Sequence, residues 1–336
     1  MEVIARRNQF PAVVGMRSRG ALALAVGAGA VLLGLVVAPS AVGAATSTAG
    51  NLPPGTSAVT QTGPGGPVQG VLKYLDSRQG VVQVAVFNAS TGTTSIVSNG
   101  SAPQATASIA KVDILAMWLH NYDAQGVAVP GAVPFSITYL MQQMIQDSVN
   151  PAATSLFYFG GGCDALTAFN TLVPTQGTTV GCQTPIYYGW GDTTTSAADQ
   201  AALVKLYAYP NNLLGADARQ YGLGLMENIS PGQGWGISCG PWGTSCNAPD
   251  YAQPVPGVTV ALKNGWKYSP SCVAQNQICP WQMNSIGWVH GDGRNYVIAV
   301  LTGYDPAGPG LYGYNYGINT VQGVSKLVWS NLAPSS

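Results

Sequence analysis

The stretch Ala105–Tyr122, ATASIAKVDILAMWLHNY, decides the fold. In its middle only Lys111 and Asp113 carry charge, and the residues around them are apolar on every face of a helix. A helix that is hydrophobic all round lies inside a protein core. The sequence therefore predicts a buried helix over 106–122, against which the other elements pack.

Ser108 and Lys111 stand three residues apart in this helix, so their side chains lie on one face within reach of each other. Burial lowers the pKa of a lysine, so that a neutral amine can take a proton from a nearby serine near pH 7. That is the Ser-Lys form of an activated nucleophile. The alternative is a helix with a polar start and a lysine whose head reaches solvent, because S-x-x-K is a short pattern.

Hydrophobic periodicity predicts further elements on both sides of this helix. Strands are expected at 81–90, 93–100, 257–266, 282–290 and 296–304, and helices at 67–78, 134–147, 150–159, 163–172, 195–208, 216–228 and 314–331. Strands from both ends of a chain with helices between them form one sheet with an insertion. The predicted fold class is α/β, of the α+β type. It has a five-stranded antiparallel sheet flanked by N- and C-terminal helices, and an inserted all-helical lobe.

The N-terminal region has the layout of a secretory signal: arginines come first, an apolar run over 21–38 follows, and small residues come next. An uncleaved membrane anchor is the alternative, because 18 apolar residues reach the lower limit for a span. Either way the remainder is secreted or extracytoplasmic. The expected organisation is a signal peptide at 1–44, a flexible linker at 45–65 and one domain at 66–333, with a sheet lobe (66–104 and 257–333) and a helical lobe (105–256).

Charge and cysteine content limit the partners. After residue 44 the chain has nine basic and twelve acidic residues, which does not suggest a nucleic acid or an anionic membrane as a partner. The six cysteines form neither a C-x-x-C motif nor a Cys/His cluster, so no metal or other cofactor is expected. Fifteen disulfide connectivities are formally possible. Proximity favours local bridges that close loops rich in Gly and Pro: Cys163–Cys182, Cys239–Cys246 and Cys272–Cys279.

Two polar triplets fall where a cleft between the lobes would need them. Ser148-Val149-Asn150 is expected between two helices, and Lys263-Asn264-Gly265 at the end of an apolar strand. Taken singly, the first is compatible with a helix N-cap and the second with a charge at a strand end. With Ser108 and Lys111 they form the ordered set S-x-x-K, S-x-N and K-x-G.

In this set the chain resembles the penicillin-binding proteins and class A β-lactamases, whose signature is S-x-x-K, S-D-N and K-T-G. The segments TASIAKVDIL, DTTTSAADQAALVKLYA and NSIGWVHGDGRNYVIAVLTGY extend the resemblance over about 67–331. The resemblance implies that Ser108 attacks an amide or β-lactam carbonyl, that Lys111 is the general base, and that Ser148 relays a proton to the leaving nitrogen.

The same resemblance implies the substrate-binding residues. Asn150 would hold the substrate's side-chain amide, and Lys263 its carboxylate. Asn264 stands where the family has Thr or Ser, and its amide could replace the lost hydroxyl. Gly265 would let the strand edge approach the ligand. The backbone N–H groups of Trp266 and of the nucleophile would form the oxyanion hole.

One departure bears on turnover. Class A enzymes use an omega-loop glutamate to activate the deacylating water, and the corresponding segment 174–192 contains none. Asp192 is its only acid and is expected to cap the following helix. Deacylation should therefore be slow.

Three functions remain open. The first is a serine hydrolase or acyltransferase acting on peptidoglycan stem peptides or β-lactams. The others are a β-lactamase with an unorthodox deacylating group and a catalytically degenerate secreted binding protein that keeps the pocket. The protein is expected to be a monomer and to meet a membrane only if the N-terminal segment is uncleaved.

Overall fold

The computed structural model describes residues 66–174, 177–182, 189–243, 256–268, 280–303 and 312–334 of the 336-residue chain. The predicted signal peptide (1–44) and linker (45–65) lie outside the described residues. Among the described residues, no helix combines the length and the apolar character that crossing a membrane requires.

A five-stranded antiparallel sheet confirms the predicted fold class. Its strand order is β2-β1-β7-β6-β5. The strands are β1 (Val81–Asn88), β2 (Thr93–Ser98), β5 (Val258–Tyr268), β6 (Trp281–Gly291) and β7 (Arg294–Gly303). β1 pairs with β7, so the sheet joins segments from both ends of the chain, and β5 is an edge strand. A second small sheet pairs β3 (Gln104–Ala105) with β4 (Thr194–Thr195).

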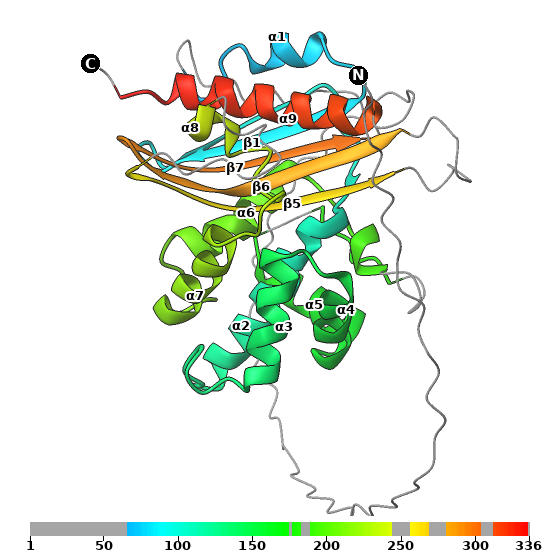
Figure 1. Cartoon of the computed structure of the whole chain (residues 1–336), viewed down its shortest axis with the longest axis vertical. Coiled ribbons are helices and arrows are strands. Elements are labelled where there is room, and N and C mark those ends of the chain that lie inside the picture. Colours follow the sequence, from blue (N-terminus) through cyan, green and yellow to red (C-terminus); the bar gives the residue numbers. More distant parts are fainter. Residues whose placement is uncertain are drawn as a thin grey trace, which may run out of the picture. The chain divides into compact units, whose positions relative to one another are not determined.

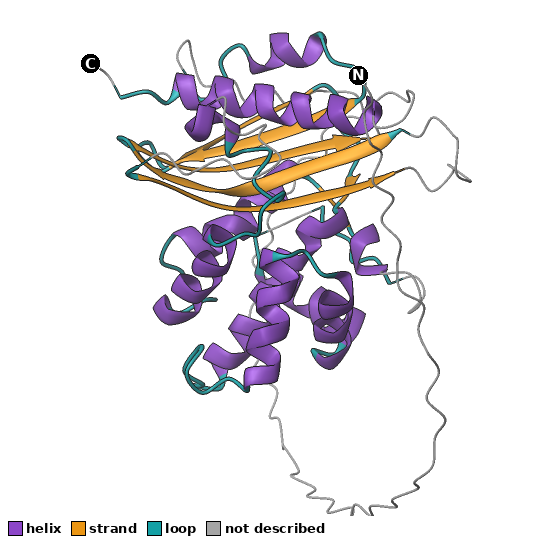
Figure 2. Ribbon diagram, in the orientation of Figure 1, coloured by secondary structure: helices purple, strands orange, loops and turns teal. Residues whose placement is uncertain are grey.

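Helices cover both faces of the sheet (Figure 1). On one face lie α1 (Val71–Asp76), α8 (Cys239–Trp242) and α9 (Tyr312–Asn331), and α9 packs on β6 and β7. On the other face α6 (Ala197–Ala208) contacts β1, β6 and β7. Figure 2 shows the sheet between these two helical layers. Two separate apolar cores result, one on each face of the sheet.

The remaining helices pack around α2 (Ala110–Ala124), which contacts each of them. They are α3 (Phe135–Gln146), α4 (Asn150–Phe159), α5 (Gly162–Leu172) and α7 (Ala216–Glu227). Nine residues of α2 are buried, including Lys111 and Asp113, as its apolar character predicts. The short 3₁₀ helices η1 (Ala107–Ile109) and η2 (Gly189–Asp192) complete this part of the chain.

Two helix starts differ from the sequence prediction. The helix expected from 106 begins at Ala110, because Ala107 has φ 48° and the chain first makes the 3₁₀ turn η1. The helix expected from 195 begins at Ala197, because the preceding residues pair with β3. Its N-cap is Ser196, whose hydroxyl accepts a hydrogen bond from the backbone N–H of Asp199.

One predicted disulfide is present, between Cys163 and Cys182. It joins α5 to the segment that leads toward η2. Cys239 is also disulfide-bonded. Its predicted partner Cys246 and the predicted pair Cys272–Cys279 lie outside the described residues.

Candidate active site

Ser108 lies in η1, between the sheet and α2. The backbone before it is fixed from two sides. Asn284 Nδ2, on β6, donates to the carbonyl oxygens of Ala105 at 2.8 Å and Thr106 at 3.0 Å. The backbone N–H of Thr106 donates to Thr193 O at 2.7 Å. The left-handed conformation of Ala107 is costly for a non-glycine residue and persists only where its surroundings impose it. These contacts hold the Ser108 hydroxyl at the start of the buried helix.

Lys111 Nζ is the centre of the polar contacts. It lies 2.9 Å from Ser108 Oγ and 2.7 Å from Asn150 Oδ1. It also contacts Ser148, at 2.7 Å from the carbonyl oxygen and 3.0 Å from Oγ. The structure therefore brings together the S-x-x-K pair and the S-x-N triplet, which are almost forty residues apart in sequence.

Ser148 connects this group to the sheet. Its Oγ also accepts a hydrogen bond from Lys263 Nζ at 2.9 Å, so one hydroxyl lies between two amines. Ser148 has φ 58°, the second strained non-glycine residue at the site after Ala107. Strained backbone of this kind is concentrated at functional sites. The contacts form a continuous chain from Ser108 Oγ through Lys111 and Ser148 to Lys263.

Burial sets the electrostatics of both amines. Desolvation, together with the nearby positive charge of Lys263, lowers the pKa of Lys111 to about 6. Desolvation likewise lowers the pKa of Lys263 to about 7. The charged form of an amine loses hydration when it is buried, and two neighbouring cations repel. Lys111 is therefore a neutral amine at pH 7 and can accept a proton.

Gly265 allows β5 to approach the nucleophile. A Cβ atom at this position would lie 2.8 Å from Ser108 N and 2.7 Å from Ile109 N, closer than packing allows. Because those neighbours are backbone atoms, they cannot move aside as a flexible side chain can. The close approach that this glycine allows in the structure is to the backbone of η1, and the approach to a ligand that the sequence suggested stays a prediction.

Two predicted binding residues have different placements. Trp266 lines the pocket beside Ser108. Asn264 does not: its side chain is 1% exposed, and its Nδ2 donates to Gln233 O at 2.8 Å and Trp235 O at 2.9 Å. Adjacent residues of a strand point to opposite faces, so Asn264 and Lys263 face opposite sides of the sheet.

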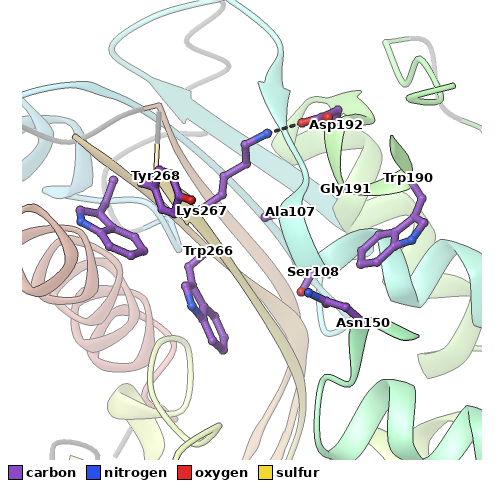
Figure 3. A pocket seen from close by; sticks show the side chains of 10 residues that line it. Ala107, Ser108, Asn150, Trp190, Gly191, Asp192, Trp266, Lys267 and Tyr268 are labelled. Carbon is purple, nitrogen blue, oxygen red and sulfur yellow. Dashed lines mark hydrogen bonds and ion pairs between the residues drawn. The ribbon is translucent and has the colours of Figure 1, made fainter. Parts of the chain in front are cut away.

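The pocket has a volume of about 450 Å³ and opens onto Ser108 (Figure 3). One wall comes from the helical side and the other from the end of β5 and the start of β6. Its lining residues are Ala107, Ser108, Asn150, Trp190, Gly191, Asp192, Trp266, Lys267, Tyr268 and Trp281. Lys111, Ser148 and Lys263 do not line it. Among the described residues, no group of three or more His, Cys, Asp or Glu side chains could hold a metal ion.

Sequence reasoning missed two features of this pocket, the Trp190 ring and an ion pair. The Trp190 ring lies 5.1 Å from Lys111 Nζ, and its Nε1 donates to Thr154 Oγ1 at 3.1 Å. Lys267 forms an ion pair with Asp192 between the two walls. Asp192 is thus not the helix cap that the sequence predicted, since Ser196 has that role. The sequence signal that could have indicated them is the segment G-W-G-D, which has a tryptophan between two glycines and directly precedes the threonine run.

In fold, the structure is similar to class A β-lactamases and to the penicillin-binding protein PBP-A. No protein-family model matches the sequence, and no curated protein matches it.

Several solved structures have a similar fold. A class A β-lactamase from Bacteroides cellulosilyticus matches with a TM-score of 0.61 at 18% identity, over 79% of this chain and 96% of that one. A PBP-A mutant in an acyl-enzyme complex with penicillin G gives a TM-score of 0.59 at 19% identity, covering 79% and 95% of the two chains. The extended-spectrum β-lactamase TLA-1 gives 0.60 at 19% identity, covering 80% and 98%. Identities this low establish the fold alone.

Proposed function

We propose that this protein is a serine hydrolase or acyltransferase that forms an acyl-enzyme at Ser108 with peptidoglycan-type peptides or β-lactams. The observation that carries the proposal is the 2.9 Å contact between Ser108 Oγ and the buried amine of Lys111. The likeness in fold to a PBP-A mutant captured as an acyl-enzyme with penicillin G supports the same chemistry.

Acylation follows from the contacts around Lys111. Its neutral amine takes the Ser108 proton while Oγ bonds to the substrate carbonyl carbon. The proton then passes through the Ser148 hydroxyl, 3.0 Å from Lys111 Nζ, to the leaving nitrogen as the C–N bond breaks. The backbone N–H groups of Ser108 and Trp266 would stabilise the negative charge on the carbonyl oxygen. Asn150, at the pocket wall, would orient the substrate.

Deacylation is proposed to be slow. Hydrolysis of the ester needs a water molecule and a base that activates it. Among the described residues, Asp192 is the only acid lining the pocket, and its carboxylate is paired with Lys267. The buried Trp190 ring lies against Lys111, where it limits the approach of water to that neutral amine. Both features favour a long-lived acyl-enzyme.

We also propose that the protein acts outside the cytoplasm, with 1–44 as its export signal. The Cys163–Cys182 disulfide supports this, because disulfides form and persist in oxidising compartments. The nine basic and twelve acidic residues after position 44 give no reason to expect a nucleic acid partner.

The test is to incubate the purified mature protein with a fluorescent penicillin and, separately, with a chromogenic cephalosporin. The proposal predicts a stable adduct in the parent, none in Ser108→Ala, and little colour change. Rapid colour would instead indicate a β-lactamase with an unorthodox deacylating group. Neither adduct nor colour would indicate a binding protein that keeps the pocket without turnover. Equal labelling of Ser108→Ala would exclude Ser108 as the nucleophile.

A further inference from the structure

Few of the basic residues of the folded part lie at the candidate site. All nine Lys and Arg residues after position 65 fall among the described residues. Only Lys111, Lys263 and Lys267 are at the candidate site. The other six do not line the pocket. Arg294, the first residue of β7, pairs with Asp292 and stacks on Trp329. A positively charged side chain that binds a substrate in this pocket must therefore be one of these three lysines.

Two of these lysines lie beneath the pocket. Lys111 and Lys263 have 0% and 1% of their surface exposed. Their amines are engaged with Ser148, and Lys263 Nζ also donates to Asn264 O at 2.9 Å. Burial favours the neutral form of both amines. A substrate in the pocket would meet neither as an exposed positive charge.

The third lysine is paired. Lys267, on β5, and Asp192, on η2, form an ion pair between the two walls (Figure 3). The Lys267 side chain is 21% exposed and the Asp192 side chain 54% exposed. The more accessible member of the pair is thus the negative one. A carboxylate entering here would be repelled by Asp192 and would have to displace it from Lys267.

The wall beside this pair is aromatic. Trp266, Tyr268 and Trp281 line the pocket and retain exposed surface. The rings of Tyr268 and Trp281 contact each other edge-on, with centroids 5.6 Å apart. Flat rings with exposed surface beside a hollow provide apolar area for a ring on the ligand. The lining therefore combines zero net charge with a flat apolar surface.

We propose that, among the β-lactam and peptide acyl donors of the proposed function, this site favours those whose carboxylate is neutralised and that carry a flat apolar group, and that Asp192 sets this preference by holding Lys267. The inference rests on the proposed acylation of Ser108 and names its substrate class. The ring of the acyl donor lies against Tyr268 and Trp281, and the position near Lys267 takes a neutral ester or amide instead of a free carboxylate.

The test compares benzylpenicillin with its methyl ester, which share the phenyl ring and differ in one charge. The rate of adduct formation is followed by intact mass at low ionic strength. The proposal predicts that the ester acylates the parent protein faster than the free acid. Equal rates, or a faster reaction of the free acid, would overturn it. If neither compound gives an adduct that depends on Ser108, the proposed function fails, which is a distinct result.

Variants test the role of Asp192. Asp192→Asn leaves Lys267 unpaired and is expected to raise the acid-to-ester rate ratio about tenfold, a change that high salt should reduce. Asp292→Asn removes a carboxylate from the other ion pair and is the matched control, with an unchanged ratio expected. An unchanged ratio in Asp192→Asn would overturn the assignment to Asp192. Tyr268→Ala should slow acylation by benzylpenicillin methyl ester more than acylation by the analogue whose side chain is acetyl in place of phenylacetyl. Equal slowing of both would contradict the ring subsite.

Discussion

Lys111 holds its amine 2.9 Å from the hydroxyl of Ser108, at the start of a helix that is largely buried. The same amine contacts Ser148 and Asn150, which the sequence places far downstream. In the proposed mechanism, the low-dielectric surroundings of α2 make this amine a base, and the strained residue Ser148 is the next proton acceptor. The proposed chemistry therefore depends on the buried helix that also organises the fold.

The pH dependence of acylation should follow the Lys111 amine. Its pKa is lowered to about 6, so the amine is protonated below that pH and neutral above it. The acylation rate should rise through about pH 6 and then level off. Lys263→Met removes a charge that lowers this pKa, so the rising limb should move to higher pH. Acylation rates measured from pH 4.5 to 9 give the midpoint of this rise, and Lys267→Met is the control. The same midpoint in Lys263→Met and in the parent would contradict the coupling between the two lysines.

Trp190 should control the lifetime of the adduct. Trp190→Ala opens the face of Lys111 to water, so the half-life of the penicillin adduct should fall about tenfold, while the acylation rate changes little. Trp190→Phe keeps a ring and should retain most of the lifetime. The half-life is measured by intact mass after excess ligand is removed. Equal lifetimes in all three proteins would show that the ring does not exclude the deacylating water.

Gly265 should tolerate no side chain. In Gly265→Ala the new Cβ would meet the backbone at Ser108 and Ile109, pushing β5 away from the nucleophile. Acylation should fall by about a hundredfold or more, because misplacement by about 1 Å has effects of that size. Gly224→Ala, on α7 with no neighbour within 4 Å, is the matched control and should leave acylation unchanged. Its stability should rise by up to about 1 kcal/mol, as alanine favours helix. Wild-type acylation in Gly265→Ala would contradict the close approach.

Asp113 should make stability depend on pH. Burial raises the pKa of this carboxyl to about 7, and Oδ2 has no hydrogen-bond partner. The folded state keeps the proton after the unfolded chain has released it, so stability falls as pH rises from about 4 to about 7 and stays lower above. Each unit of pKa shift corresponds to about 1.4 kcal/mol.

Asp113→Asn should remove this dependence, because an amide does not ionise. The difference in Tm between Asp113→Asn and the parent should therefore favour the variant more at pH 8 than at pH 5. Thermal unfolding by circular dichroism at the two pH values measures the gain, with Asp76→Asn, exposed on α1, as the control for the loss of one carboxylate. A gain that is equal at both pH values would contradict the raised pKa.

The sequence predicted those parts of the molecule that local patterns encode. The apolar surroundings of Lys111 predicted the buried helix, and alternating residues around Lys263 predicted a strand. The meeting of Ser148 with both lysines was inferred from resemblance to a family, since no local pattern specifies a contact across more than thirty residues. The structure supplies that contact, and the roles of these residues stay proposals.

Tertiary contacts decided what the sequence could not predict. The left-handed turn at Ala107 is imposed by hydrogen bonds from Asn284, a residue on β6. Asp192 pairs with a lysine on the far wall instead of capping a helix, because Ser196 lies closer to the first turn of α6. Asn264 is held away from the pocket by its hydrogen bonds to the carbonyl oxygens of Gln233 and Trp235, contacts that no local pattern specifies.

The central claim is that Ser108 becomes covalently acylated. The direct measurement is peptide mapping by mass spectrometry after incubation with penicillin, in the parent and in Ser108→Ala. The account predicts one adduct per chain, carried by the peptide that contains Ser108 and absent from Ser108→Ala. An adduct on another residue, or the same adduct in Ser108→Ala, would contradict it.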